Sequence, residues 1–174
     1  MIKMCGIILI LASSAGIGFN LSNIMRLRLN ELAELKKMIL MLRGEIKYTG
    51  TPLGEAFGVI ARRTKGVYSE LFKNTGMELN ALSGKTLPEI WKEQYASELM
   101  KNESHLSDKD FKWLLQFAEG LGYLDKEMQL GTIELYMEQL DEIIEAGTKD
   151  FTKNSKLCKA LGICAGLFLT IILI

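Results

Sequence analysis

The 174-residue sequence contains very little proline, histidine or cysteine: two, one and three residues, respectively. So few prolines leave long stretches that a helix can occupy without interruption. The cysteines are Cys5, Cys158 and Cys164, which lie in or beside the apolar ends of the chain. None has CxxC or Cys/His spacing, which argues against a disulfide framework and against a structural zinc site.

Motifs for common chemistries are also missing. The sequence has no GxxxxGK[S/T] phosphate-binding loop, no HExxH pair and no EF-hand loop. Its single histidine, His105, lies in a polar stretch and is predicted to be a solvated loop residue rather than a general base. The formal net charge is zero, which disfavours nucleic acid as a partner. We therefore expect no catalytic residue, no bound cofactor and no metal ligand.

Charge is absent from both ends of the chain. Met4–Leu21 and Ala160–Ile174 contain no charged side chain, whereas all 21 acidic residues lie between them. A helix needs about 20 apolar residues to cross a bilayer, so each end is long enough for one span. The expected segments are a transmembrane helix over 1–21, a charged helical-bundle domain over 22–156 and a second transmembrane helix over 157–174.

Basic residues flank these apolar ends on their inner sides. They are Arg26, Arg28, Lys36 and Lys37 after the first segment, and Lys149, Lys153, Lys156 and Lys159 before the second. Basic residues near membrane ends stay in the cytoplasm, so the bundle is predicted to be cytoplasmic and both termini to lie outside. A cleaved signal peptide ending near Ser13-Ser14-Ala15 is the alternative for the first segment.

Small residues on the last segment suggest close helix packing. Gly162 and Gly166 are four residues apart, a spacing that lets membrane helices approach closely. The contact would lie within one chain or between copies, so a homo-oligomer is a possible assembly.

The charged middle of the chain has the periodicity of helices throughout. Leu32, Leu35, Ile39, Leu42 and Ile46 form a heptad seam that continues from the first apolar segment without a proline. A second seam runs into the last apolar segment. It comprises Ile133, Met137, Leu140, Ile144, Gly147 and Phe151. We expect an all-α fold of about six helices, in which the long first and last helices pack antiparallel.

Helix-start signals place the shorter helices between the seams. Thr51 is predicted to be an N-cap with Pro52 at the first helical position, and Asp125 is predicted to cap the last helix. The expected short helices cover about 52–64, 67–82, 86–100 and 107–119. Trp91 and Trp113 fall at apolar helical positions and are expected in the core.

The two long helices carry opposite charge. Between Arg26 and Lys47 there are six basic and three acidic residues, and between Glu119 and Asp150 there are nine acidic and two basic ones. Acidic residues three or four apart repel one another on a helix, so a basic surface is expected opposite them. That surface would be the first helix or a separate partner. The candidate docking residues are Glu134, Glu138, Asp141, Glu142 and Glu145.

Two motifs resemble a known family. Glu45-Ile-Lys-Tyr-Thr-Gly-Thr-Pro-Leu-Gly-Glu-Ala56 and Gly120-Leu-Gly-Tyr-Leu-Asp-Lys-Glu-Met-Gln129 are similar to stretches of the stage III sporulation protein AB family. Tyr123 and Leu124 depart from the small or polar residues usual before the aspartate of the second motif. The resemblance spans nearly the whole chain, and it includes both apolar ends.

The resemblance implies a structural role in a secretion-like assembly. The family is similar to the cytoplasmic domains of type II secretion F proteins and belongs to the channel complex between mother cell and forespore. It implies a non-enzymatic platform subunit in the mother-cell membrane, with membrane lipid and other channel proteins around it. A secretion-type ATPase of the same operon would be its cytoplasmic partner. The alternatives are a membrane-anchored regulator or sensor, and an enzyme with a carboxylate metal site.

Overall fold

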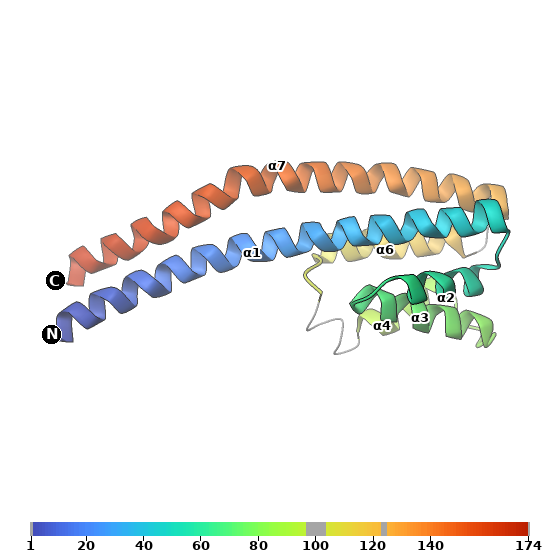
Figure 1. The fold of residues 1–174 in the computed structure, drawn as a ribbon, viewed down its shortest axis with the longest axis horizontal. Helices are drawn as coiled ribbons and strands as arrows, with labels where there is room; N and C mark the ends of the chain where they lie inside the picture. The colour runs from blue at the N-terminus through green and yellow to red at the C-terminus, as the bar shows by residue number, and fades with distance from the viewer. Residues whose placement is uncertain (1, 97–103, 123–124, 174) are drawn as a thin grey trace. The chain divides into compact units, whose positions relative to one another are not determined.

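The computed structural model describes residues 2–96, 104–122 and 125–173. Most side chains within 2–17 and 154–173 fall outside this description. The regular structure of the described residues is entirely helical, with six α-helices and one π-helical turn (Figure 1). The predicted all-α fold of about six helices is confirmed.

Two long helices carry the ends of the chain, and four short helices lie between them. The long helices are α1 (Ile2–Gly44) and α7 (Lys126–Leu173). The short helices are α2 (Leu53–Arg63), α3 (Val67–Asn80), α4 (Leu87–Tyr95) and α6 (Asp108–Leu121), and a π-helical turn, η1 (Glu45–Thr49), follows α1. As predicted, α1 and α7 each continue from the charged sequence into an apolar end. The chain divides into a bundle unit, Glu31–Ile143, and a terminal unit formed by Met1–Asn30 and Ile144–Ile174.

The core of the bundle unit is built on the predicted seam of α1. Its five residues, Leu32, Leu35, Ile39, Leu42 and Ile46, are at most 3% exposed. On α7, Ile133 and Leu140 of the second seam are fully buried. Periodicity therefore located the inner faces of both long helices correctly.

Aromatic side chains join the short helices to this core. The rings of Phe57 on α2 and Phe72 on α3 meet edge to face, with centroids 4.9 Å apart. Trp91 on α4 is fully buried beside them, and its Nε1–H donates to Thr75 Oγ1 at 2.9 Å. The buried indole is thus satisfied, as an interior donor must be. Trp113 is also buried, so both tryptophans are core residues as predicted.

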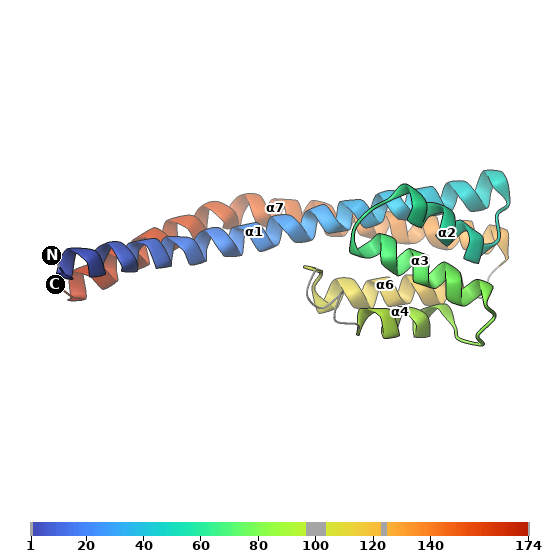
Figure 2. The same ribbon diagram turned by 60° about the horizontal axis from the view of Figure 1, so that its bottom comes forward.

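A close approach between α2 and α3 explains why α3 contains Gly76, a residue type with low helix propensity. The two helices lie side by side in both ribbon views (Figure 2). A Cβ atom built on Gly76 would lie 2.8 Å from the carbonyl oxygen of Gly54 and 3.0 Å from the backbone nitrogen of Gly58. Both neighbours are backbone atoms that cannot move aside, so the packing requires glycine at position 76.

In the terminal unit, α1 and α7 also approach closely. A Cβ atom on Gly147 would lie 2.8 Å from Leu29 Cδ2. No helix in the described part of the chain is long and apolar enough to cross a bilayer. Most side chains of both expected transmembrane segments, and the surroundings of Gly162 and Gly166, fall outside what the structure describes.

Two of the three predicted caps are displaced by one position. Pro52 itself is the N-cap of α2, and its carbonyl oxygen accepts the first helical bond from the backbone N–H of Ala56 at 2.9 Å. Thr51 lies before the helix, and its hydroxyl faces Glu45 instead. An extended ψ of 146° at Pro52 delays the helix by one residue. At α7, Asp125 Oδ1 accepts from the backbone N–H of Met128 at 2.9 Å, which is the cap that the sequence predicts.

Alanine substitutions at two neighbouring glycines test this packing. Gly76→Ala should destabilise the protein by about 1–3 kcal/mol, because its methyl group overlaps the backbone of α2. Gly58→Ala is the matched control, since its Cβ would meet only the Arg62 guanidinium at 3.6 Å. The control should be neutral or stabilising by up to about 1 kcal/mol from helix propensity. Urea unfolding of the full chain in detergent measures both; equal midpoints for the two variants would contradict the account.

Candidate interaction surfaces

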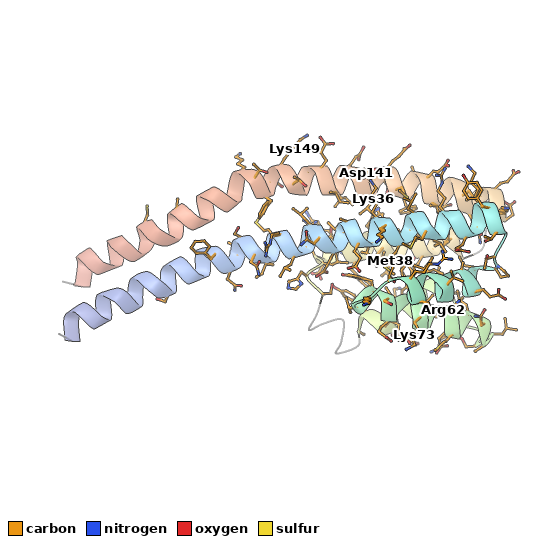
Figure 3. The ribbon with its side chains drawn as sticks, viewed as in Figure 1. Lys36, Met38, Arg62, Lys73, Asp141 and Lys149 are labelled. Carbon is orange, nitrogen blue, oxygen red and sulfur yellow. The ribbon has the colours of Figure 1, made fainter. Side chains whose placement is uncertain are left out.

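Two ion pairs join α1 to α7 in the bundle unit. Lys36 Nζ pairs with Asp141 (Figure 3). An Arg43 guanidinium nitrogen pairs with Glu134. The partners are seven residues apart on each helix and in opposite order, which sets an antiparallel register. All four side chains are 31–57% exposed, so each pair contributes about 0.2–1 kcal/mol and specifies alignment more than stability. For Glu134 and Asp141, the compensating basic surface is therefore the first helix, one of the two predicted alternatives.

The other acidic residues of α7 have different surroundings. Glu145 Oε1 pairs with Lys149 one turn later at 2.6 Å, and this hydrogen bond holds the pKa of Glu145 below its usual value. Glu138 and Glu142 are exposed and form no ion pair with any residue that the structure describes. Of the five candidate docking residues, these two remain open to a partner.

A half-buried carboxylate on α1 anchors two other segments. Glu31 Oε2 accepts a hydrogen bond from the Tyr68 hydroxyl on α3 at 2.6 Å. The backbone N–H of His105 donates to the same carboxylate at 2.9 Å, and His105 Nδ1 lies 2.6 Å from Glu31 Oε1. Glu31 thus ties α1 to α3 and to the residues just before α6.

The prediction for His105 was right that the residue lies outside the helices, and it was wrong about its solvation. Its ring is paired with Glu31 and is only 32% exposed, whereas a solvated loop residue was expected. Glu31 and His105 are 74 residues apart in sequence, so no local pattern shows their contact. The Ser104 hydroxyl also donates to Glu31 Oε2, at 3.3 Å. Because protein groups from separate segments engage this carboxylate, we interpret the cluster as a structural anchor.

Burial and the Glu31 carboxylate both act on Tyr68. Burial raises the pKa of the Tyr68 phenol strongly, and the hydrogen bond to Glu31 raises it further. A phenolate beside a carboxylate in a partly desolvated site would be repelled, so the neutral hydroxyl is retained as a donor.

The first family motif forms a tight connection between α1 and α2. Glu45 Oε1 accepts from Arg63 Nη1, at the end of α2, at 3.0 Å, and the Glu45 carboxylate also faces the hydroxyls of Thr49 and Thr51. Gly50 closes η1 with φ of 65°, a left-handed conformation that favours glycine. This role of Glu45 was not predicted, although the motif that contains it was recognised.

The second family motif forms the connection between α6 and α7. Gln129 Nε2 donates to the carbonyl oxygen of Leu121 at the end of α6, at 3.3 Å. A Cβ atom on Gly120 would lie 2.8 Å from Thr132 Cγ2, so the helices meet closely here. Tyr123 and Leu124, the departures from the family pattern, lie outside the described residues. Both motifs therefore have structural explanations.

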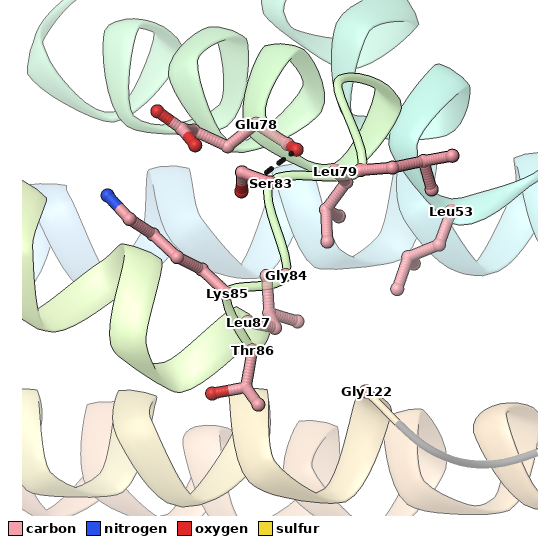
Figure 4. A pocket seen from close by; sticks show the side chains of 10 residues that line it. Leu53, Glu78, Leu79, Ser83, Gly84, Lys85, Thr86, Leu87 and Gly122 are labelled. Atoms are coloured by element: carbon pink, nitrogen blue, oxygen red, sulfur yellow. Dashed lines mark hydrogen bonds between the residues drawn. The ribbon is translucent and has the colours of Figure 1, made fainter.

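An apolar pocket of about 310 Å³ lies at the turn between α3 and α4 (Figure 4). Four leucines contribute to its lining: Leu53, Leu79, Leu82 and Leu87. Leu82 is 88% exposed and has φ of 50°, a left-handed conformation that is rare for a bulky residue. Strained backbone conformations cluster at functional sites, so this pocket is a candidate interaction surface.

The carboxylate metal site is not supported at the acidic row. Glu134 is engaged by Arg43, and no group of three or more His, Cys, Asp or Glu side chains among the described residues is arranged to hold a metal ion.

Because its pKa is raised, Tyr68 is predicted to contribute no tyrosinate absorbance in an alkaline titration. Between about pH 9 and 11, where a free tyrosine ionises, Tyr68 should stay neutral in the folded protein. Tyr68→Phe should therefore leave the tyrosinate absorbance at 295 nm unchanged over this range, although one of five tyrosines is lost. Because the folded pKa is raised, the stabilising effect of Tyr68 is complete below about pH 10 and is lost as the pH rises further. Loss of one tyrosine's absorbance in the variant would contradict the burial of this hydroxyl.

Comparison with known proteins agrees with the two motifs. The sequence profile of the family described as stage III sporulation protein AB matches residues 3–174. The stage III sporulation protein AB of Bacillus subtilis (strain 168) is 30% identical over 175 residues, which cover 99% of each chain. A solved structure of stage III sporulation protein AB (SpoIIIAB) has 24% identity and a TM-score of 0.61, and the match covers 72% of this chain and 96% of the solved one.

The structural match shows a shared fold, and the profile covers almost the entire chain. The resemblance carried by the residues around Thr51-Pro52 and Asp125 is therefore confirmed. The chain belongs to the stage III sporulation protein AB family, whose role is in sporulation.

Proposed function

We propose that this chain is a non-enzymatic membrane platform subunit of the sporulation channel between mother cell and forespore. Its bundle would lie in the mother-cell cytoplasm and dock a secretion-type ATPase of the same operon. The observation that carries the proposal is the continuity of α1 and α7, each a single helix that runs from charged bundle sequence into an uncharged end. A helix that leaves the bundle without a break transmits position, which suits a platform better than a flexible tether would.

The boundaries of the two proposed transmembrane helices follow from the charge distribution along the sequence. Transmembrane helices over 1–21 and 157–174 would contact lipid and other membrane proteins of the channel, with Gly162 and Gly166 available for helix packing. The basic residues on their inner flanks favour a cytoplasmic position for 22–156.

The pocket at the α3–α4 turn is the surface that we assign to the ATPase. Leucine side chains line it, and Leu82 stands exposed at its rim. An apolar side chain presented by the ATPase would fill the cavity and cover Leu82, and burial of this surface would stabilise the complex. The acidic row is a less favourable ATPase site than the sequence suggested, because Arg43 and Lys36 already neutralise Glu134 and Asp141.

A substitution at Leu82 separates binding from folding. Leu82→Gly removes the apolar side chain and also relieves the left-handed conformation, so the fold should be at least as stable as the wild type. We expect at least a tenfold loss in capture of the purified ATPase by the full chain in nanodiscs, about the effect of one buried apolar anchor.

Met77→Gln is the matched control for this experiment. Met77 is 58% exposed and does not line the pocket, so its replacement removes a comparable exposed apolar side chain elsewhere. The control should capture the ATPase as the wild type does. Undiminished capture by Leu82→Gly would exclude the pocket as the docking site, and no capture by the wild type would exclude the ATPase as a partner.

A further inference from the structure

The solvent face of α1 carries a second periodic pattern beside its buried seam. We call it the α1 stripe: Ala33, Lys37, Leu40 and Gly44 on α1, followed by Lys47 in η1. Successive members are four or three residues apart, so they lie along one side of the helix. Leu40 is 50% exposed, and a Cβ atom on Gly44 would meet nothing within 4 Å.

The solvent face of α7 carries a matching pattern with acidic charge. We call it the α7 stripe: Met128, Gly131, Leu135, Glu138 and Glu142. Met128 and Leu135 are 56% and 54% exposed, and a Cβ atom on Gly131 would also meet nothing within 4 Å. Glycine weakens a helix interior relative to alanine, so an open glycine here gains nothing within the chain.

No charged side chain that the structure describes neutralises either stripe. Lys37, Glu138 and Glu142 form no ion pair with any described residue, in contrast to Lys36 and Asp141, which bond to each other. Both stripes therefore offer exposed leucine, open glycine and uncompensated charge of opposite sign.

One antiparallel register matches the three central positions of the two stripes. Aligning Leu40 with Leu135 also aligns Gly44 with Gly131, and Lys37 with Glu138. In the same register the end positions Ala33 and Lys47 meet Glu142 and Met128. We infer that two copies of this chain pair in this register, with the α1 stripe of each copy against the α7 stripe of the other. Opposite charge would fix the register, and the glycines would let the helices approach closely.

The pairing is compatible with two-fold symmetry. Leu40 lies one turn from Lys36, and Glu138 lies one turn from Asp141. Both stripes therefore lie beside the line of contact between α1 and α7, on its solvent side. A two-fold axis parallel to the helices then forms both contacts at once, as an isologous interface requires. Such an axis keeps the register of the Lys36–Asp141 and Arg43–Glu134 pairs, from which the proposed pairing is shifted by two residues, about 3 Å of helix rise. The α1 helices of the two copies run in the same direction, which insertion into one membrane demands. The interface leaves the leucine pocket uncovered and does not depend on ATPase docking.

Disulfide trapping between differently tagged copies tests the register. In a full-length background with all three cysteines replaced by serine, a Leu40→Cys copy is mixed with a Leu135→Cys copy in nanodiscs and oxidised with copper phenanthroline. We expect a disulfide-linked heterodimer. Leu40→Cys mixed with Glu142→Cys is the control, because the cysteines would be about 10 Å out of register and should not link. Equal linking in both mixtures, or none in the first, would overturn the proposal.

Charge reversal tests the electrostatic part independently. Lys37→Glu and Glu138→Lys should each weaken pairing of the full chain roughly tenfold or more, and the double variant should restore it. Lys112→Glu reverses an exposed lysine on α6 and should leave pairing unchanged. Subunit mass in detergent across a concentration series gives the affinity. Failure of the double variant to restore pairing, or ATPase crosslinked to Leu135→Cys in place of a second copy, would contradict the assignment. ATPase capture through Leu82 is measured separately, so either result stands without the other.

Discussion

The burial of one face of α1 is the constraint on which the rest of the structure depends. The four seam residues on α1 are at most 1% exposed, Ile46 continues the seam into η1, and the aromatic core joins the short helices to the same unit. The buried seam occupies only one face of α1, so the other sides of the helix face α7 or solvent. Lys36 and Arg43 point along the edge that meets α7, while Lys37 and Leu40 are left to solvent. The helix therefore contributes one face to the core and exposes another to solvent.

Two carboxylates, one near each end of the seam, hold the short helices in place. Glu31 receives Tyr68 and His105 near one end, and Glu45 receives Arg63 near the other. Their side chains are 14% and 12% exposed, and both carboxylates have hydrogen-bond partners. Each carboxylate therefore anchors separate segments of the fold to one another. The arrangement fits a protein that acts through its surfaces and is consistent with the proposed platform role.

Sequence reasoning predicted the features that depend on local periodicity. The α1 seam, the two core tryptophans and the Asp125 cap all follow from spacing within one helix. The Glu31–His105 anchor could not be found in this way, since its partners come from distant segments. The backbone strain at Leu82 could not be predicted either, because leucine is not a residue type that favours a left-handed conformation. The division of the acidic row depended on knowing which side of α7 meets α1, and periodicity alone leaves that rotation open. The motif around Thr51-Pro52 was recognised, but its N-cap lay one residue later than expected.

The central claim is that both ends of the chain cross a membrane and leave the bundle in the cytoplasm. Alkaline phosphatase, which is active only outside the cytoplasm, reports this directly when it is fused after Ile174 and, separately, inserted at Gly84 in the α3–α4 turn. The account predicts activity for the fusion after Ile174 and none for the insertion at Gly84, in sporulating cells that contain equal amounts of both proteins. Activity at Gly84 with none after Ile174 would contradict it.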